Sequence, residues 1–296
     1  MVQASFRAGM LSLAGRTAVI TGAASGIGRA MARRFSAEGM AVVAADVDAD
    51  ALDGLAADPG FSSPVRVVPT DVSDPSSVEA LADLVFGEFG EVGVLCNNAG
   101  VGPMGTIWEV GVPEWEWVLG VNLWGVINGV RSFIPRMLES GKGGHVVNTA
   151  SMAGLIAGRE MTRWRLGAYA ASKHAVVAIS HTLFAELRTA GAPIGVSLLC
   201  PAAVNTRIWD VERLRPRSGS EPGHPSSEEA ERLQAQLRTG LELGNTPAEV
   251  AEMVLEAVVE DRFYVFTSPG SPQQVGRHVG DLLDLRNPPV PGLDSR

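Results

Sequence analysis

The chain has 296 residues, of which 46% are hydrophobic and 19% are charged, and its formal net charge is −9. This composition fits a globular α/β protein of one large domain or two smaller ones. The acidic balance and the lack of a basic run argue against a nucleic-acid partner, and the apolar runs are too short to span a membrane. Cys96 and Cys200 are expected to be buried thiols, and residues 1–14 lack a signal-peptide pattern, so we expect the cytosol.

The first predicted strand, Thr17–Thr21, runs into a glycine-rich turn that is followed by apolar residues at helical spacing over 29–38. A strand, a glycine turn and a helix in this order are the setting of a dinucleotide site. Gly22 would permit the tight turn, Gly26 would let the backbone approach a pyrophosphate, and Gly28 would let the helix lie close to the sheet. A plain tight turn would use the same glycines.

The second predicted strand covers 39–45 and ends at Asp46. An acid roughly 20 residues beyond the glycine turn can accept hydrogen bonds from both hydroxyls of an adenosine ribose and would repel a 2′-phosphate. No basic residue stands at 45–50 to compensate, so the sequence predicts NAD rather than NADP. The alternative is that Asp46, Asp48 or Asp50 caps the helix expected at 51–57.

The third and fourth predicted strands, 65–69 and 93–96, flank a helix expected over 75–88. Asp71 follows the third strand, where it could bond an adenine amino group or merely cap a turn. Asn98 and Gly100 follow the fourth strand, at the sheet edge where a doubly wound fold binds ligands. The amide is expected to brace this strand against the glycine turn, and Gly100 to admit a close ligand.

A long helix is predicted over 113–139, with Asn122 in its middle. Asn is a poor helix former, so this amide could open the backbone ladder and hold a water, or could be a tolerated polar residue. The fifth strand, 144–149, leads to Ser151. The next helix, 168–189, carries Tyr169 and Lys173 four positions apart and therefore on one face.

The Tyr169 and Lys173 pair predicts a general acid and base for an alcohol or a carbonyl. A phenol has a pKa of about 10, and a neighbouring ammonium is expected to lower that pKa. Ser151 could donate a hydrogen bond to the same substrate oxygen. An ordinary surface pair on an amphipathic helix is the alternative.

The sixth strand, 194–199, precedes residues 207–245, which break the alternation of strands and helices and are interpreted as a substrate lid. A helix at 248–260, a strand at 263–267 and a helix at 273–285 follow. The alternation predicts an α/β fold: a doubly wound parallel sheet of about seven strands with helices on both faces. We expect a single domain over 15–286, between an extension at 1–14 and a tail at 287–296.

Together and in this order, these motifs resemble the short-chain dehydrogenase/reductase family over about residues 15–270. The matching pieces are Thr21 to Gly28, Asp71, Asn97 to Gly100, Asn122, Ser151, Tyr169 with Lys173, and Pro201 to Thr206.

The resemblance implies catalytic roles for four residues. Tyr169 would exchange a proton with the substrate oxygen, and Lys173 would lower the pKa of Tyr169 and hold the nicotinamide ribose. Ser151 would orient the substrate, and Asn122 would hold a water that links Lys173 to solvent.

The resemblance also implies NAD as cofactor and a homodimer or homotetramer built on the helices at 113–139 and 168–189. The backbone around Val204 and the Thr206 hydroxyl would fix the nicotinamide amide. The expected cofactor-binding residues are Gly22, Ser25, Gly26, Ile27, Gly28, Asp46, Asp71, Val72, Asn98, Ala99, Gly100, Tyr169, Lys173, Pro201, Val204 and Thr206.

The chain departs from the family pattern at Ala202, where Gly is usual, and in a longer stretch at 158–166 that contains three arginines. That stretch could rim the substrate entrance, or could be a surface loop or an oligomer contact. An apolar substrate pocket is predicted from Met152, Leu155, Ile208 and Trp209. Residues 117–136 and 213–216 also resemble a branch that includes aryl-alcohol dehydrogenases.

The function expected from these residues is NAD(H)-dependent interconversion of a secondary alcohol and a ketone on a medium to bulky, largely apolar substrate. The alternatives are a non-catalytic NAD-binding redox sensor, and an epimerase or dehydratase with tightly held NAD. His145, His174 and His181 lack partners at ligand spacing, so no metal site is predicted and structural roles are expected for them.

Overall fold

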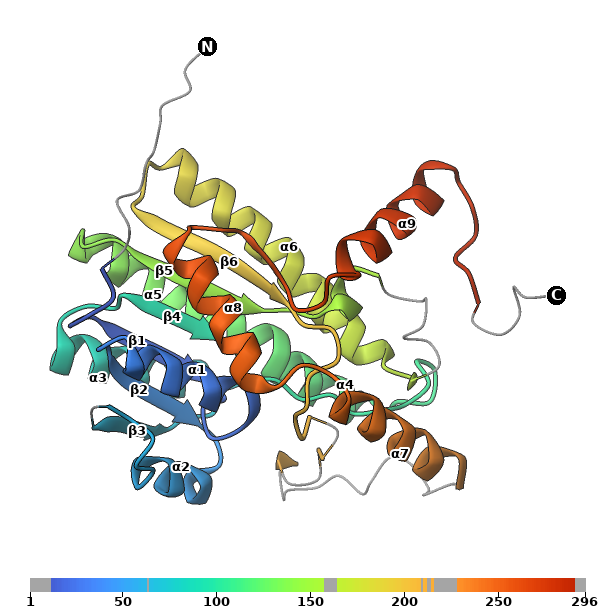
Figure 1. Ribbon diagram of the computed structural model, residues 1–296, viewed down its shortest axis with the longest axis horizontal. Helices are drawn as coiled ribbons and strands as arrows, with labels where there is room; N and C mark the ends of the chain where they lie inside the picture. The colour runs from blue at the N-terminus through green and yellow to red at the C-terminus, as the bar shows by residue number, and fades with distance from the viewer. Residues whose placement is uncertain are drawn as a thin grey trace, which may run out of the picture.

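The computed structural model describes residues 12–62, 64–156, 164–208, 210–211, 214–215 and 228–290. Within them lies a seven-stranded sheet with the strand order β3-β2-β1-β4-β5-β6-β7, in which every neighbouring pair is parallel (Figure 1). The chain therefore starts in the middle of the sheet, winds outward to β3, returns to β4 and winds to the other edge. The predicted doubly wound α/β fold is confirmed.

The strands are β1 (Thr17–Thr21), β2 (Ala41–Asp46), β3 (Val65–Pro69), β4 (Val94–Asn97), β5 (Gly144–Thr149), β6 (Ile194–Cys200) and β7 (Tyr264–Phe266). The helices are α1 (Gly26–Ala37), α2 (Ala49–Ala56), α3 (Pro75–Phe89), α4 (Val112–Leu119), α5 (Gly125–Ser140), α6 (Gly167–Thr189), α7 (Glu228–Glu242), α8 (Pro247–Val259) and α9 (Ser271–Leu283). Short helical turns lie at Gly120–Trp124 (η1) and Met152–Gly154 (η2).

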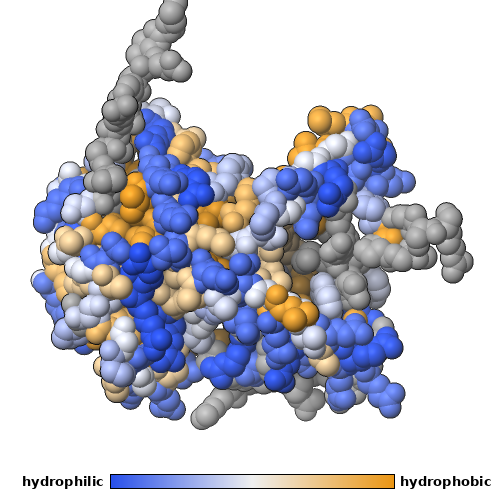
Figure 2. All heavy atoms as spheres, in the orientation of Figure 1, coloured by the Kyte–Doolittle hydropathy of each residue, from blue (hydrophilic) through white to orange (hydrophobic). Residues whose placement is uncertain are grey.

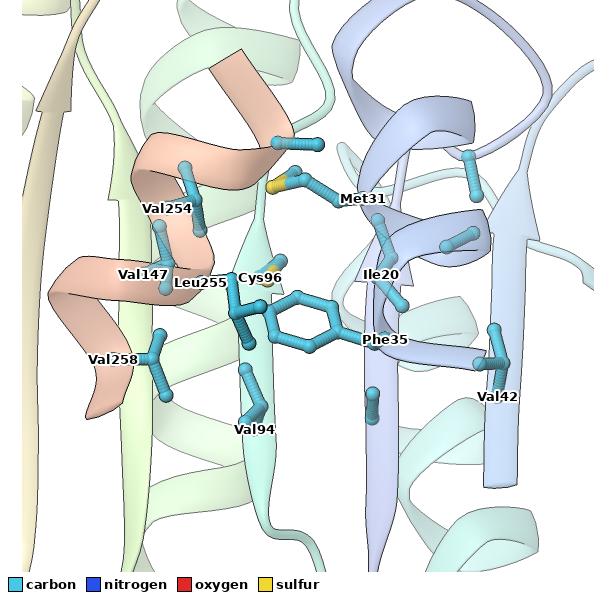
Figure 3. Packing of buried hydrophobic residues seen from close by; sticks show 14 of the residues in the cluster. Ile20, Met31, Phe35, Val42, Val94, Cys96, Val147, Val254, Leu255 and Val258 are labelled. Carbon is cyan, nitrogen blue, oxygen red and sulfur yellow. The ribbon is translucent and has the colours of Figure 1, made fainter. Parts of the chain in front are cut away.

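Helices cover both faces of the sheet. Successive strand residues point to opposite faces, and apolar residues lie on both. Ile20 packs into the layer under α1 and α8, where Met31, Phe35, Val254 and Leu255 fill the space between helices and strands (Figure 3). The next residue back along β1, Val19, packs into the other layer, under α3, α5 and α6. Strands buried on both faces explain their nearly continuous apolar sequences.

The helix predicted over 113–139 is divided in the structure. α4 ends at Leu119, a π-helical turn occupies Gly120–Trp124, and α5 follows. The wider turn surrounds Asn122, the residue at which an opened backbone ladder was predicted. Of the two interpretations of Asn122, the opened backbone ladder is confirmed and the tolerated polar residue is not; that the opening would be a π-turn was not predicted.

α9 stands away from the body of the molecule (Figure 1). Apolar residues gather at its far end (Figure 2), where Leu282 and Leu283 are 68% and 76% exposed. No helix among the described residues is long and apolar enough to cross a membrane.

Candidate active site

A cavity of about 1130 Å³ opens along the carboxyl ends of the strands. It exceeds the roughly 300–1,000 Å³ that is typical of a site for one small ligand, so it has room for a cofactor and a substrate. Most predicted site residues line it: Gly22, Ser25, Gly26, Ile27, Asp46, Asp71, Val72, Asn98, Ala99, Gly100, Ser151, Met152, Tyr169, Lys173, Pro201, Val204, Thr206 and Ile208.

The glycine turn is packed too tightly for side chains. Gly22 has a φ of 67°, and a Cβ on it would lie 2.8 Å from the Cα atom of Ala99. A Cβ on Gly28 would lie 2.1 Å from the carbonyl oxygen of Gly22. Gly28 therefore does not line the cavity itself; its role is to seat α1 against the turn. Ser25 precedes α1 without capping it through its side chain, so the first N–H groups of α1 remain suited to an anion.

Asn98 braces β4 against the glycine turn, as predicted. Its Nδ2 donates to the carbonyl oxygen of Thr21 at 3.0 Å, and its Oδ1 accepts from the hydroxyl of Thr149 at 3.3 Å. Thr21 completes the brace, because its Oγ1 accepts from the backbone N–H groups of Asn98 and Ala99 at 2.9 and 3.1 Å. Sequence analysis gave Thr21 as the end of a strand and the start of the glycine-turn motif, and did not predict this role.

The carboxylate of Asp46 is held in place by the backbone. Its Oδ2 accepts from the N–H of Ala24 at 2.9 Å, and its Oδ1 accepts from the N–H of Asp48 at 3.1 Å. The helix cap that was the alternative for Asp46 belongs to Asp48, which accepts from the N–H of Ala51. Asp46, Asp48 and Asp50 all line this end of the cavity, which therefore carries negative charge.

Asp71 closes a turn. Its Oδ1 accepts from the N–H and the hydroxyl of Ser73, at 2.9 and 2.7 Å. The turn-capping alternative is therefore confirmed. Asp71 also lines the cavity, so its predicted contact with an adenine amino group stays a prediction.

Asn122 is fully buried and holds the backbone that follows β4. Its Oδ1 accepts from the N–H of Val101 at 2.8 Å, and its Nδ2 donates to the carbonyl oxygen of Val101 and to the hydroxyl of Ser172. A Cβ on Gly100 would lie 3.3 Å from Oδ1 of Asn122 and 3.4 Å from Nζ of Lys173. The Asn122 amide and the Lys173 ammonium thus both lie close to Gly100, which has no side chain to separate them.

Tyr169 and Ser151 both line the cavity. Burial raises the pKa of Tyr169, and the Ser151 hydroxyl opposes that rise. The net shift of this pKa is upward because burial is its largest cause, and the predicted lowering by Lys173 stays a prediction.

The ammonium of Lys173 hydrogen-bonds a backbone carbonyl. Its Nζ donates to the carbonyl oxygen of Thr149 at 2.7 Å and lies 5.8 Å from the centre of the Tyr169 ring. Burial lowers the pKa of Lys173 to about 8, which still leaves the group largely protonated at neutral pH. The Lys173 ammonium is thus fixed near the Tyr169 ring, and it donates its hydrogen bond to the backbone carbonyl of Thr149.

The substrate end of the cavity is more apolar and differs in part from the prediction. Met152 and Ile208 line it, whereas Leu155 does not and instead packs beside the core between α6 and β6. Trp209 lies outside the described residues. A Cβ on Gly102 would lie 3.4 Å from Ile208 and 3.6 Å from the Tyr169 ring, which places Ile208 near the phenol. Lining residues that sequence reasoning missed are Trp117, Val121, Ile156, Leu166, Leu214 and Leu237.

The stretch at 158–166 and the lid at 207–245 are described only in part. Residues 158–163, which include Arg159 and Arg163, lie outside the described residues, as do 209, 212–213 and 216–227. Trp164 and Leu166 line the cavity. Nine described residues of 207–245 also line it: Arg207, Ile208, Asp210, Val211, Leu214, Arg215, Leu237, Gly240 and Leu241.

The histidines have structural partners, as predicted. His145 Nε2 lies 2.8 Å from the hydroxyl of Ser197, and His174 Nδ1 lies 2.7 Å from the carbonyl oxygen of Gly154. His181 Nε2 lies 2.8 Å from the hydroxyl of Tyr264. The described residues contain no group of three or more His, Cys, Asp or Glu that could hold a metal ion. Both cysteines are buried free thiols.

Comparison with known proteins identifies the same family as the sequence motifs. The family model described as short chain dehydrogenase matches residues 16–216. A 1-deoxy-11-beta-hydroxypentalenate dehydrogenase of Streptomyces exfoliatus is 41% identical over 86% of this chain and 83% of its own. A C alpha-dehydrogenase of Sphingobium sp. is 32% identical over 91% of this chain and 86% of its own.

A solved structure from Burkholderia phymatum, a short chain dehydrogenase/reductase in complex with NAD, superposes with a TM-score of 0.88 at 43% identity. The match covers 95% of this chain and 99% of that one. The matched region of this chain contains the glycine turn, Ser151, Tyr169 and Lys173. The chain therefore belongs to the short chain dehydrogenase family and is an oxidoreductase.

Proposed function

We propose that this protein is an NAD(H)-dependent enzyme that interconverts a secondary alcohol and a ketone on a medium to bulky, largely apolar substrate. One observation carries the proposal. Ser151, Tyr169 and Lys173 line the same cavity as the glycine turn and Asp46. This arrangement supports a proton-transfer role for Tyr169 at one end of a site whose other end suits a dinucleotide.

The residues present fit NAD. Gly22 and Gly26 line the cavity without side chains of their own, which would let the backbone of the turn come close to a pyrophosphate. The carboxylate of Asp46, held by two backbone N–H groups, would accept the ribose hydroxyls and repel a 2′-phosphate. The Burkholderia phymatum relative was solved with NAD, which supports the same choice. We propose the remaining cofactor contacts at Asp71, Val72, Val204 and Thr206, which also line the cavity.

The chemistry divides between cofactor and protein. Bound NAD supplies the acceptor or donor of a hydride. The Tyr169 phenol would give its proton to the oxygen of a ketone, or its phenolate would take the proton of an alcohol. The Ser151 hydroxyl, which lines the same cavity, would hold that oxygen beside the phenol. Because burial keeps the phenol protonated, the positive charge of Lys173 would be needed to favour the phenolate during alcohol oxidation.

The substrate class follows from the other end of the cavity. Met152, Ile208, Trp117 and Leu214 present apolar surface near Tyr169 and suit a hydrophobic body around the reacting carbon. The Streptomyces relative is named for a hydroxylated substrate, which supports an alcohol as the reacting group.

We also propose a homodimer or homotetramer in the cytosol. Trp124, at the end of η1, is 49% exposed, and Leu138 on α5 is 43% exposed. Together with the exposed end of α9, they are apolar surfaces that a second copy could cover. Two buried free thiols suit a reducing compartment.

The proposal is tested by incubating the purified protein with NAD or NADP and a panel of secondary alcohols, with NADH or NADPH absorbance as the readout. We expect NAD-dependent turnover that favours bulky apolar alcohols. Binding of NAD without turnover of any alcohol, or of the matching ketones with NADH, would indicate a redox sensor instead. Protein that purifies with stoichiometric NAD would favour an epimerase or dehydratase.

A further inference from the structure

Two residues that follow β6, Leu214 and Arg215, are held on α4 although they belong to no long helix or strand. Nη1 of Arg215 donates to Oε2 of Glu114 at 2.5 Å, and Nη2 donates to Oε1 at 3.3 Å. Each of these side chains is only 15% exposed. A two-point, largely buried ion pair is stronger and more directional than a surface pair.

The arginine makes a second contact with the same helix. Its guanidinium carbon lies 5.3 Å from the centre of the Trp117 ring, one turn after Glu114 on α4. This distance allows a cation–π interaction. Glu114 and Trp117 thus hold one guanidinium between them, and we call this arrangement the Glu114–Arg215 latch.

Leu214 is adjacent to Arg215 and packs against the same part of the molecule as the latch. It packs, with Trp117 and Val121, on a small cluster that includes the buried Ala168. Ala168 directly precedes Tyr169 on α6. Trp117, Val121 and Leu214 also line the cavity, so the latch fixes the apolar wall that lies beside the phenol.

We propose that Glu114 is a positioning residue for substrate binding: through Arg215 it holds Leu214 and Trp117 as the wall that receives the apolar body of a bulky alcohol or ketone. This inference rests on the proposed function. Irregular backbone costs conformational entropy to order, so residues 214–215 need such an anchor to stay on α4. The latch lies outside the proton-transfer group, so it acts on binding of large substrates and not on the chemistry.

The test compares Glu114→Gln with Glu116→Gln, since Glu116 is an exposed glutamate on the same helix. The probes are 1-(2-naphthyl)ethanol, which is long enough to reach the wall, and 2-propanol, which is not. In Glu114→Gln we expect the KM for the naphthyl alcohol to rise about tenfold, as for loss of one charge-assisted hydrogen-bonded pair. Its kcat, the kcat/KM for 2-propanol and the Kd of NADH should stay within about twofold of wild type. Glu116→Gln should leave all four unchanged.

Arg215→Met keeps the apolar stem over Trp117 and removes the charge. If the two side chains act as one unit, the Glu114→Gln, Arg215→Met double variant has a KM no higher than the worse single variant. Additive effects in this cycle, or an equal loss with 2-propanol, would overturn the proposal.

Amide hydrogen exchange of a peptide containing Leu214 gives a readout that does not depend on turnover. Faster exchange in Glu114→Gln than in wild type and Glu116→Gln supports the latch even if neither alcohol is oxidised, a result that would count against the proposed function alone. Unchanged exchange in Glu114→Gln would show that no latch exists.

Discussion

The side-chain amide of Asn122 pairs with both backbone groups of Val101. Oδ1 accepts from the Val101 N–H at 2.8 Å, and Nδ2 donates to the Val101 carbonyl oxygen at 2.9 Å. The pair joins the π-turn between α4 and α5 to the chain that leaves β4. It thereby fixes the segment from Gly100 to Gly102, which lines the cavity beside Tyr169 and Lys173.

Asn122→Leu should therefore reduce both stability and turnover. The substitution leaves the buried N–H and carbonyl of Val101 without partners, at a cost of about 2–5 kcal/mol in the free energy of unfolding. Urea unfolding followed by circular dichroism measures this loss. Asn122→Asp retains the Oδ1 acceptor and should lose less. A leucine variant as stable as wild type would contradict the structural role given to Asn122.

Asp46→Ala should change the choice of cofactor. Loss of the carboxylate removes the acceptor for the ribose hydroxyls and the repulsion of a 2′-phosphate. The ratio of kcat/KM with NAD to kcat/KM with NADP is expected to fall at least about tenfold. Asp50→Ala, which removes another acid from the same end of the cavity, should leave the ratio nearly unchanged. A wild-type preference for NADP would refute the reading of Asp46.

His145 should make the protein sensitive to acid. Burial lowers the pKa of His145 to about 4, and Arg188 adds to this while Asp261 opposes it. Between the unfolded pKa of about 6.5 and the folded value, the unfolded chain binds a proton that the native one does not. The stability contributed by neutral His145 is thus present above that range and is lost as pH falls through it, by about 3 kcal/mol.

The acid sensitivity is measured as the difference in urea unfolding free energy between neutral and mildly acidic pH. His145→Gln carries no titrating group and should show a smaller difference than wild type, even if it is less stable at neutral pH. The same difference in both proteins would assign the acid sensitivity to other groups.

Trp124→Glu should weaken the proposed oligomer. A charge placed on an apolar side chain that is 49% exposed would be buried without a partner if a second copy covers it. Size-exclusion chromatography with light scattering gives the mass directly. Trp108→Glu is the matched control, because Trp108 is 80% exposed and lies before α4. A wild-type protein with the mass of a monomer would contradict the oligomer proposal.

Local patterns predicted most of the fold and the cofactor end of the site. The glycine turn, Asp46 and the apolar strands each depend on neighbours close in sequence. What the sequence did not reveal depends on contacts across the fold. Arg215 reaches Glu114 across 101 positions, and the desolvation that raises the pKa of Tyr169 depends on what packs around the phenol.

Leu155 illustrates a second limit. It was a candidate for the substrate wall, yet it packs against the core beside β6 without lining the cavity, whereas its neighbour Ile156, a buried member of that core, also lines the cavity. Two adjacent apolar residues in a tight turn thus differ in whether they line the cavity, and the residue types alone do not show which one does.

The measurement that tests the central claim most directly is turnover by Tyr169→Phe, with NADH binding followed by calorimetry on the same sample. The variant keeps the ring and removes the one hydroxyl proposed to move the proton. We predict that NAD-linked turnover falls by at least about a hundredfold, while the Kd of NADH stays within a few-fold of wild type. A Tyr169→Phe protein that oxidises alcohols at the wild-type rate would contradict the account.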